Sequence, residues 1–259
     1  MTIQTKNLSD LLWNAEKSRK GVSALTDMNP DLTVEEAYNI QLDTIQAKLE
    51  IGETISGKKI GLTSLAMQQL LGVNEPDYGH LLQSMEVKNG EVISRQQLLE
   101  PKVEGEIAFF LKKELAGPNV TVADVLDATE YVVAALEIVD SRIAGWKIKL
   151  CDTVADNASS GLYVLGDKKL PPHQLDLKEE KMSFYKNEQL INEGMGKAAL
   201  GDPAYCVAWL ANKLSEFGIT LKANEVILSG AISAAVNAEE GDEFVAKFQT
   251  LGEVKVNFK

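Results

Sequence analysis

The stretch Pro101-Lys-Val-Glu-Gly-Glu-Ile-Ala-Phe-Phe110 alternates in a way that predicts a strand with two different faces. Residues two apart in a strand point to the same side, so Glu104 and Glu106 project together while Val103 and Ile107 face apolar packing. Two adjacent carboxylates repel each other and lose solvation. A divalent cation such as Mg²⁺ or Mn²⁺ would make the pair tolerable, because these ions prefer oxygen ligands. A solvent-facing acidic strand explains the same spacing, and this stretch alone leaves both interpretations open.

A second apolar run, Tyr131-Val-Val-Ala-Ala-Leu-Glu137-Ile-Val-Asp-Ser-Arg142, places one carboxylate inside the densest aliphatic segment of the chain. An unpaired carboxylate in such surroundings is expensive, so Glu137 needs a cation or a protonating environment. Arg142 is close in sequence, but five residues along a strand is a long reach. Glu104, Glu106 and Glu137 on two strands would form a one-sided metal site with positions left for substrate and water.

Three further segments carry polar groups of functional interest. The segment Gly57-Lys-Lys-Ile-Gly-Leu-Thr-Ser64 predicts a strand whose lysine, backbone amides and hydroxyl can face an anion. The segment Glu75-Pro-Asp-Tyr-Gly79 has the composition of a turn. Residues 146–161 pack small and polar side chains closely after a strand, which indicates either a structured loop with functional groups or an ordinary capped turn.

The remainder of the chain predicts an α+β fold. The first fifty residues show helical spacing, and Thr33 with Glu36 forms a capping-box pattern before a helix that ends near Gly52. Short β-like runs follow, and they do not alternate regularly with full-length helices, which disfavours a doubly wound sheet. We expect a small helical N-terminal segment, residues 1–55, packed on a β-rich body with a mixed, curled sheet, residues 56–259. The two parts are expected to form one compact unit.

The elements of the body are predicted from periodicity and from cap residues. Helices are expected at 64–71, 122–128 and 203–217, the last capped by Asp202 and closed by Gly218. Strands are expected at 58–62, 91–94, 103–111, 131–139, 162–165, 182–185, 226–229, 244–248 and 254–258.

Charge and composition exclude several classes of function. The 259 residues carry 38 acidic and 26 basic side chains, giving a formal net charge of −12, and no basic patch predicts a nucleic-acid partner. His80 and His173 are the two histidines, which disfavours a His-based triad or zinc site. Cys151 and Cys206 lack metal-type spacing, so we expect free thiols in a reducing compartment. Without a signal-peptide pattern or an apolar run of ~18 residues, a cytoplasmic protein with no membrane span is expected.

Taken in order, several blocks resemble the hydratase and decarboxylase branch of the fumarylacetoacetate hydrolase superfamily, and the resemblance covers nearly the whole chain. The blocks are Lys59-Ile-Gly-Leu-Thr-Ser64, Leu71-Gly-Val-x-x-Pro-Asp-Tyr-Gly79, Val103-Glu-Gly-Glu-Ile-Ala-Phe109, Glu137-Ile-Val-Asp-Ser-Arg142, Asp152-Thr-Val-Ala-Asp-Asn-Ala-Ser159, Cys206-Val-Ala-Trp-Leu-Ala-Asn212 and Val226-Ile-Leu-Ser-Gly230. No single block is decisive, but their order and spacing together are specific. The resemblance implies a fold like that of the fumarylacetoacetate hydrolase C-terminal domain.

The resemblance also implies roles for particular residues. The implied assignments are Glu104, Glu106 and Glu137 as ligands to Mg²⁺ or Mn²⁺, Lys59 and Asp77 as catalytic groups, and Thr63 and Ser159 as substrate-binding groups. The lysine and the aspartate would act as a coupled acid–base pair. Lys147 and Lys149 are the reserve lysines if Lys59 proves structural.

The activity that the resemblance implies is that of a metal-dependent lyase acting on a small 2-oxo or 2-hydroxy-dienoic acid. Its first form is a hydratase that converts 2-hydroxypenta-2,4-dienoate to 4-hydroxy-2-oxopentanoate in the meta-cleavage catabolism of aromatic compounds. The alternatives are decarboxylation of 4-oxalocrotonate (2-oxo-3-hexenedioate) in the same pathway and a non-catalytic partner subunit. The family further implies a homo-oligomer and an association between the sister hydratase and decarboxylase.

Individual residues favour one or the other of the two reactions. Asp77 favours water addition, because the sister decarboxylases typically lack this aspartate. The segment Gly230-Ala-Ile-Ser-Ala-Ala-Val236 is more like a decarboxylase tail. Lys197 and Tyr205 stand where smaller or differently polar residues are typical. The group that the pocket accepts at the far end of the substrate is therefore not assigned from the sequence.

Overall fold

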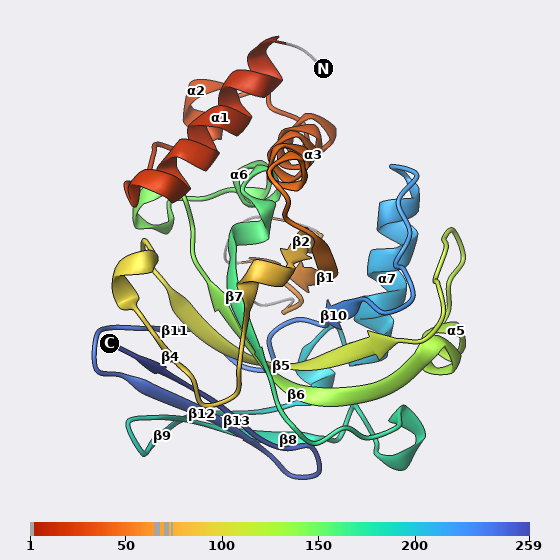
Figure 1. Cartoon of the computed structure of the whole chain (residues 1–259). Coiled ribbons are helices and arrows are strands. Elements are labelled where there is room, and N and C mark those ends of the chain that lie inside the picture. The colour runs from red at the N-terminus through yellow and green to blue at the C-terminus, as the bar shows by residue number, and fades with distance from the viewer. Residues whose placement is uncertain (1–2, 65–67, 70–72, 74) are drawn as a thin grey trace.

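The N-terminal part of the chain forms helices on one side of the molecule (Figure 1). The computed structural model describes residues 3–64, 68, 69, 73 and 75–259. These helices are α1 (Ile3–Ser18), α2 (Leu25–Met28) and α3 (Val34–Glu50). Thr33 caps α3 as predicted, because its hydroxyl accepts from the Glu36 backbone N–H while the Glu36 carboxylate accepts from the Thr33 backbone N–H.

Buried polar contacts tie these helices to the rest of the fold. Gln41 on α3 donates through Nε2 to the carbonyl oxygens of Tyr78 and Val154. The Asp152 carboxylate accepts from both the backbone N–H and the hydroxyl of Thr26. Because a buried amide or carboxylate is costly unless it is hydrogen-bonded, these contacts fix where the helices sit.

The larger sheet is mixed, and the described residues give it eight strands in the order β2-β1-β10-β5-β6-β7-β3, with β11 also paired to β5. The strands are β1 (Ile55–Gly61), β2 (Asp77–Leu82), β3 (Glu86–Val87), β5 (Lys102–Leu111), β6 (Thr129–Val139), β7 (Ser160–Leu165), β10 (Val226–Leu228) and β11 (Val236–Asn237). β1 runs parallel to β10, whereas β5 and β6 are antiparallel. The long β5 and β6 curve across the molecule in Figure 1.

A second sheet, in the order β4-β13-β12-β8-β9, lies below β5 and β6 in Figure 1. Its strands are β4 (Val92–Ile93), β8 (Lys181–Lys186), β9 (Gln189–Met195), β12 (Glu243–Phe248) and β13 (Gly252–Phe258). A Cβ on Gly105 of β5 would lie 3.5 Å from the Ala246 side chain on this sheet. Val103 and Ile107 share that face and are fully buried. The even-numbered Glu104 and Glu106 therefore face the opposite side of β5.

The remaining helices are α5 (Val122–Ala128), α6 (Leu150–Ala155) and α7 (Pro203–Ser215). Asp202 caps α7 by accepting from the Ala204 backbone N–H, with Pro203 at the first helical position, as the sequence predicts. Most of the apolar side chains of α7 are buried, and the helix packs on β1. Gly218, which follows α7, has φ +69°, a conformation that glycine adopts without strain.

The α+β fold class with mixed, curled sheets is confirmed. Every predicted strand overlaps an observed one, whereas β2, β3, β9 and β11 were not predicted. The predicted helix at 64–71 falls mainly on residues outside the described ones. Both cysteines are free, with Cys206 buried and Cys151 partly buried. No helix in the described parts of the chain is long and apolar enough to cross a membrane.

The interpretation of Glu75–Gly79 as a turn is wrong. Asp77, Tyr78 and Gly79 lie in β2 and pair with β1 in an antiparallel ladder. Local composition favoured a turn because proline, aspartate and glycine are common there. The backbone hydrogen bonds that β1 offers outweigh that preference, and this pairing is not visible in the local sequence.

Candidate metal centre

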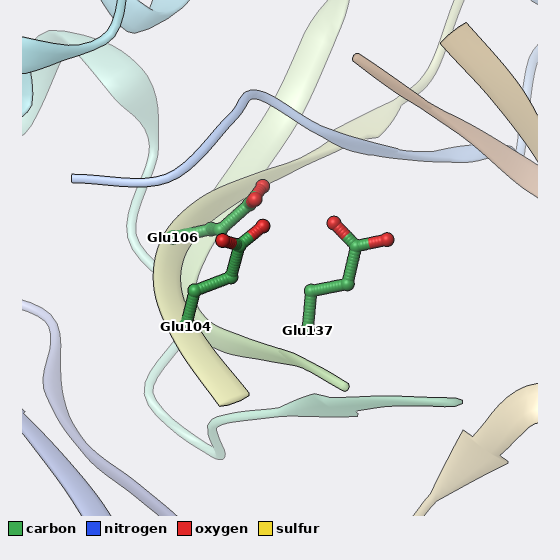
Figure 2. Close-up of side chains that lie close together, drawn as sticks. All are labelled: Glu104, Glu106 and Glu137. Atoms are coloured by element: carbon green, nitrogen blue, oxygen red, sulfur yellow. The ribbon is translucent and has the colours of Figure 1, made fainter. Parts of the chain in front are cut away.

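Three carboxylates meet on two neighbouring strands of the larger sheet. Glu104 on β5 lies directly opposite Glu137 on β6, and Glu106 is two residues further along β5. Each of the three offers one carboxylate oxygen such that these oxygens all lie within 4.8 Å of one another. Figure 2 shows the three side chains directed toward the same space. The structure thus brings together the three glutamates that the sequence selects.

The surroundings make this cluster electrostatically unfavourable as it stands. Glu106 and Glu137 are buried and Glu104 is partly buried. Among the described residues, Glu106 Oε1 and both Glu137 oxygens have no hydrogen-bond partner, while Glu106 Oε2 accepts from the Gly230 backbone N–H at 2.8 Å. Burial first, and then the neighbouring carboxylates, raise the pKa of Glu104 to about 8 and that of Glu106 well above its ordinary value.

The pKa of Glu137 is also raised by burial, although the neighbouring Lys59 opposes the shift. Buried carboxylates such as Glu106 and Glu137, whose oxygens accept no hydrogen bond from the described residues, are rare without a partner, because each unsatisfied group carries a desolvation penalty. Oxygen donors at this spacing, open on one side, suit a hard divalent cation. The residues present therefore fit a metal centre.

Lys59 on β1 reaches this cluster from three strands away. Its Nζ lies 3.3 Å from Glu137 Oε1 on β6, although β10 and β5 separate the two strands in the sheet. Three strand spacings measure roughly 14 Å along a flat sheet. The sheet must therefore curl strongly, so that both side chains point into its concave face. Burial alone would lower the pKa of Lys59, but the carboxylates around it, Glu137 foremost, raise it above its ordinary value.

Asp77 at the start of β2 is a second carboxylate near Lys59, with its Oδ1 4.0 Å from the lysine Nζ. In the register of β1 with β2, Asp77 is opposite Gly61. A Cβ on Gly61 would clash with Asp77 Oδ1 and lie 2.9 Å from Lys59 Nζ. Glycine at this position therefore leaves the room in which the lysine and the aspartate approach each other. The sequence does not predict this role of Gly61, although Gly61 belongs to the same family-like block as Lys59.

The two residues predicted to bind substrate lie in different environments. Thr63 is buried beside Gly230, and its hydroxyl has no hydrogen-bond partner within the described residues. Ser159 is also buried, but its hydroxyl donates to Asp156 Oδ2 at 3.1 Å. The reserve lysines, Lys147 and Lys149, are both exposed, unlike Lys59.

Lys197 and Tyr205, the two residues that depart from the family pattern, are not in the core. Lys197 is half exposed and pairs with Glu179 at 3.0 Å, and Tyr205 is 48% exposed on α7. On β2, His80 faces the side of the strand opposite to Asp77 and Gly79. Its ring contacts Gln41 of α3 through Nδ1. The Gly230 backbone N–H on Glu106 was not predicted, because a backbone donor has no signature in the sequence.

The chain belongs to the fumarylacetoacetate hydrolase C-terminal family, whose model matches residues 72–259. Among its relatives is a 2-hydroxyhexa-2,4-dienoate hydratase of Comamonas testosteroni, 48% identical over 95% of this chain and 94% of that protein. A 2-hydroxypent-2,4-dienoate hydratase of Pseudomonas putida is 53% identical over 82% of this chain and 96% of that protein.

The solved structures point to the same branch of the family. The 4-oxalocrotonate decarboxylase from Pseudomonas putida G7, complexed with magnesium and adipate, superposes with a TM-score of 0.97 and 35% identity. The alignment covers 100% of this chain and 99% of the decarboxylase chain. A second structure of the same decarboxylase holds calcium and acetate and gives a TM-score of 0.96. Hydratases are thus the relatives with the higher sequence identity, and a decarboxylase shares the fold in full.

Proposed function

We propose that this chain is a divalent-metal-dependent lyase that adds water to 2-hydroxypenta-2,4-dienoate and releases 4-hydroxy-2-oxopentanoate. The observation that carries the proposal is the cluster of three carboxylates beside Lys59 and Asp77, two of which are buried and have oxygens left open by the described residues. The hydratase names of relatives at 48% and 53% identity support the same class of substrate.

Glu104, Glu106 and Glu137 are the proposed ligands of the cation, with Mg²⁺ or Mn²⁺ as the ion. When bound, the ion would supply Lewis-acid chemistry for the 2-oxo acid part of the substrate. The magnesium and calcium complexes of the structurally similar decarboxylase support a divalent ion at such a site. The Gly230 backbone N–H keeps one Glu106 oxygen in place and leaves the other free for this use.

Lys59 and Asp77 are the proposed acid–base pair. In the first stage the enol O–H loses its proton and C5 gains one, which gives the 2-oxo-3-enoate. In the second stage the water oxygen bonds to C4 and C3 gains a proton. Lys59 is kept as an ammonium by the surrounding carboxylates, and its Nζ donates to the Ala158 carbonyl oxygen at 2.9 Å. In the first stage it gives a proton to C5 and takes up the proton of the enol O–H; in the second it gives a proton to C3, and the proton that Asp77 takes from water restores the ammonium. Asp77 accepts a proton from the water through Oδ1, which is buried and has no hydrogen-bond partner among the described residues.

Thr63 is the proposed contact for the substrate carboxylate. Its buried hydroxyl is open in the described structure and lies against Gly230, next to the backbone N–H that binds Glu106. Ser159 stays a prediction as a substrate-binding residue, since Asp156 occupies its hydroxyl. A buried hydroxyl that gains a partner only when substrate binds contributes selectivity, because an analogue without that partner leaves it unsatisfied.

Decarboxylation of 4-oxalocrotonate is the second candidate, and the full-length structural match to a 4-oxalocrotonate decarboxylase favours it. The two reactions share a 2-oxo acid and a metal and differ in what happens beyond C3. Asp77 is the residue of this chain that favours hydration, because a carboxylate close to the reacting atoms can take a proton from water.

The test is a paired assay of the purified protein with Mg²⁺ and with a chelator. With 2-hydroxypenta-2,4-dienoate we expect metal-dependent formation of 4-hydroxy-2-oxopentanoate. With 2-oxo-3-hexenedioate we expect much slower release of CO₂. Faster CO₂ release than water addition would replace the hydratase by the decarboxylase, and turnover of neither acid would overturn both.

A further inference from the structure

A left-handed turn of three non-glycine residues lies directly beside the lysine of the proposed site. Asn157, Ala158 and Ser159 form η4 (Asn157–Ser159) and have φ angles of 54°, 49° and 51°. Side chains with a Cβ disfavour this region, and a run of three such residues is unusual. Strained backbone of this kind persists only where surrounding contacts hold it, and it concentrates at functional sites.

The turn contacts both members of the proposed acid–base pair. The Ala158 carbonyl oxygen accepts a hydrogen bond from Lys59 Nζ at 2.9 Å. The Asn157 side chain binds the strand that carries Asp77, because its Oδ1 accepts from the His80 backbone N–H at 2.7 Å and its Nδ2 donates to the His80 carbonyl oxygen at 2.9 Å. One turn thereby links β1 and β2 at the point where the pair meets.

The position of β2 in the sheet makes this attachment feasible. β2 is the edge strand next to β1, so the backbone groups of His80 that point away from β1 need partners from elsewhere. The Asn157 carboxamide offers one acceptor and one donor, as a neighbouring strand would. A Cβ on Gly79 would lie 2.5 Å from the Asn157 carbonyl oxygen and 3.0 Å from its Oδ1. The glycine of the Pro-Asp-x-Gly segment therefore makes room for Asn157.

The other end of the turn is fixed by a buried ion pair. Arg142 Nε contacts Asp156 Oδ1 at 2.5 Å, and Asp156 Oδ2 accepts from the Ser159 hydroxyl at 3.1 Å. The turn is thus held between Asp156 on one side and β2 on the other.

We propose that Asn157 is a positioning residue, which holds the Ala158 carbonyl oxygen where it directs the Lys59 ammonium between Asp77 and Glu137. The inference rests on the proposed function, because the geometry matters only if these groups exchange protons with the substrate. Asn157 acts through the backbone of its own turn, and its carboxamide is occupied by His80. Its loss shifts the carbonyl and leaves Lys59 without a fixed orientation.

The test variant is Asn157→Gly, because glycine tolerates the positive φ while the substitution removes the side chain with its carboxamide. The chain offers a matched control in Asn212 on α7. Its Oδ1 accepts from the Val120 backbone N–H at 2.7 Å, and its Nδ2 donates to the Val120 carbonyl oxygen at 2.9 Å. Asn212→Ala therefore removes the same pair of hydrogen bonds away from the metal centre, in a helix that alanine suits.

With 2-hydroxypenta-2,4-dienoate and Mg²⁺, we expect Asn157→Gly to lower kcat by up to about 100-fold, since displacement of a reacting group by ~1 Å has effects of this size. KM and the Mg²⁺ affinity should stay within about 3-fold, because the binding groups are untouched. Asn212→Ala should leave kcat unchanged. Hydrogen exchange at the His80 amide should accelerate in Asn157→Gly and not in Asn212→Ala.

The outcomes separate this inference from the proposed function. A wild-type protein that turns over neither 2-hydroxypenta-2,4-dienoate nor 2-oxo-3-hexenedioate overturns the proposed function and the inference with it. An active wild type together with a full kcat in Asn157→Gly overturns the inference alone. Equal losses of kcat in Asn157→Gly and Asn212→Ala would also overturn it, because the effect would then follow from lost stability.

Discussion

The fold contains two clusters of buried charged side chains, and they differ in how their polar atoms are hydrogen-bonded. In the first, Arg142 donates to Asp156 and to the carbonyl oxygens of Asp140 and Ser160, and Asp156 accepts further bonds from its neighbours. In the second, Glu106 and Glu137 of the candidate metal centre keep oxygens without hydrogen-bond partners among the described residues. The two clusters have similar burial but differ in whether their polar atoms are satisfied.

This difference distinguishes a cluster that stabilises the fold from one that can bind a ligand. A buried ion pair with every group hydrogen-bonded holds the chain in one arrangement and has little capacity left for a ligand. A buried cluster with open oxygens carries a desolvation penalty that a ligand can relieve. Sites that bind and react are expected in the second kind of cluster, and perturbed pKa values gather there for the same reason. The following variants test that division, from the largest expected effect to the smallest.

Glu106→Gln should have the largest effect, because it removes one charge from the open cluster while keeping the shape of the side chain. We expect metal-dependent turnover to fall by at least about 1,000-fold, which corresponds to about 4 kcal/mol of transition-state stabilisation. The measurement is kcat/KM at saturating Mg²⁺, with circular dichroism to verify the fold. Near-normal activity would exclude Glu106 as a metal ligand.

Metal binding by this variant gives a second measurement. Mg²⁺ at 100 times its Kd should stabilise the wild-type protein against unfolding by about 2.7 kcal/mol and should stabilise Glu106→Gln much less. Glu193→Gln on β9 is the matched control, since Glu193 is exposed and lies on the second sheet. It should keep both the activity and the stabilisation by Mg²⁺.

Asp156→Asn should act on stability, because it breaks the closed cluster and removes the carboxylate that directly pairs with the buried Arg142. We expect the free energy of unfolding to fall by about 3–5 kcal/mol in urea denaturation. Asp127→Asn is the control, since Asp127 pairs with Lys113 on the surface and its loss should change stability by less than about 1 kcal/mol. Equal effects of the two variants would contradict the role assigned to the buried pair.

Asp77→Asn should separate the two stages of the reaction. The variant keeps the size of the side chain but removes the carboxylate that accepts a proton from water. We expect water addition to slow by about 100-fold or more, while ketonisation of the dienol slows by less than about 10-fold. Ketonisation is followed by loss of the dienol absorbance in the presence of Mg²⁺, and hydration by the 4-hydroxy-2-oxo product. The same loss in both stages would remove Asp77 from the water step.

His80→Asn should have the smallest effect, because it concerns a buried group that the fold keeps neutral. Burial, with the nearby Lys58 charge, lowers the pKa of His80 to about 3, while its ring binds Gln41 through Nδ1. The unfolded chain takes up this proton near the ordinary pKa of histidine, so between these values the unfolded state binds more protons. The free energy of unfolding therefore decreases by about 1.4 kcal/mol for each pH unit of acidification in that window.

His80→Asn should remove this contribution, so that the stability difference between wild type and variant shrinks as the pH decreases from about 6 to about 4. The measurement is urea denaturation of both proteins at several pH values within the window. A difference that does not change with pH would show that His80 is not kept neutral by the fold.

The glutamates of the candidate site were predictable because the periodicity of a strand is local. Glu104 and Glu106 share a face by parity, and the aliphatic run around Glu137 indicates burial without any knowledge of partners. The catalytic roles of Lys59 and Asp77 were implied by the family resemblance, which rests on the order of the sequence blocks, and not by strand geometry. The composition around Asp77 predicts a turn, because it carries no information about the strand beside it.

The sequence by itself determined the α+β class, the positions of most strands and the side chains proposed to bind a metal, because residue type, alternation and caps act over a few neighbours. Only the tertiary structure decided which of them meet. Lys59 reaches Glu137 across two intervening strands because the sheet curls, and the surroundings of Gly61, Gly79 and Asn157 are set by the backbone and side chains that approach them. These contacts join residues far apart in the chain, so local preferences cannot specify them.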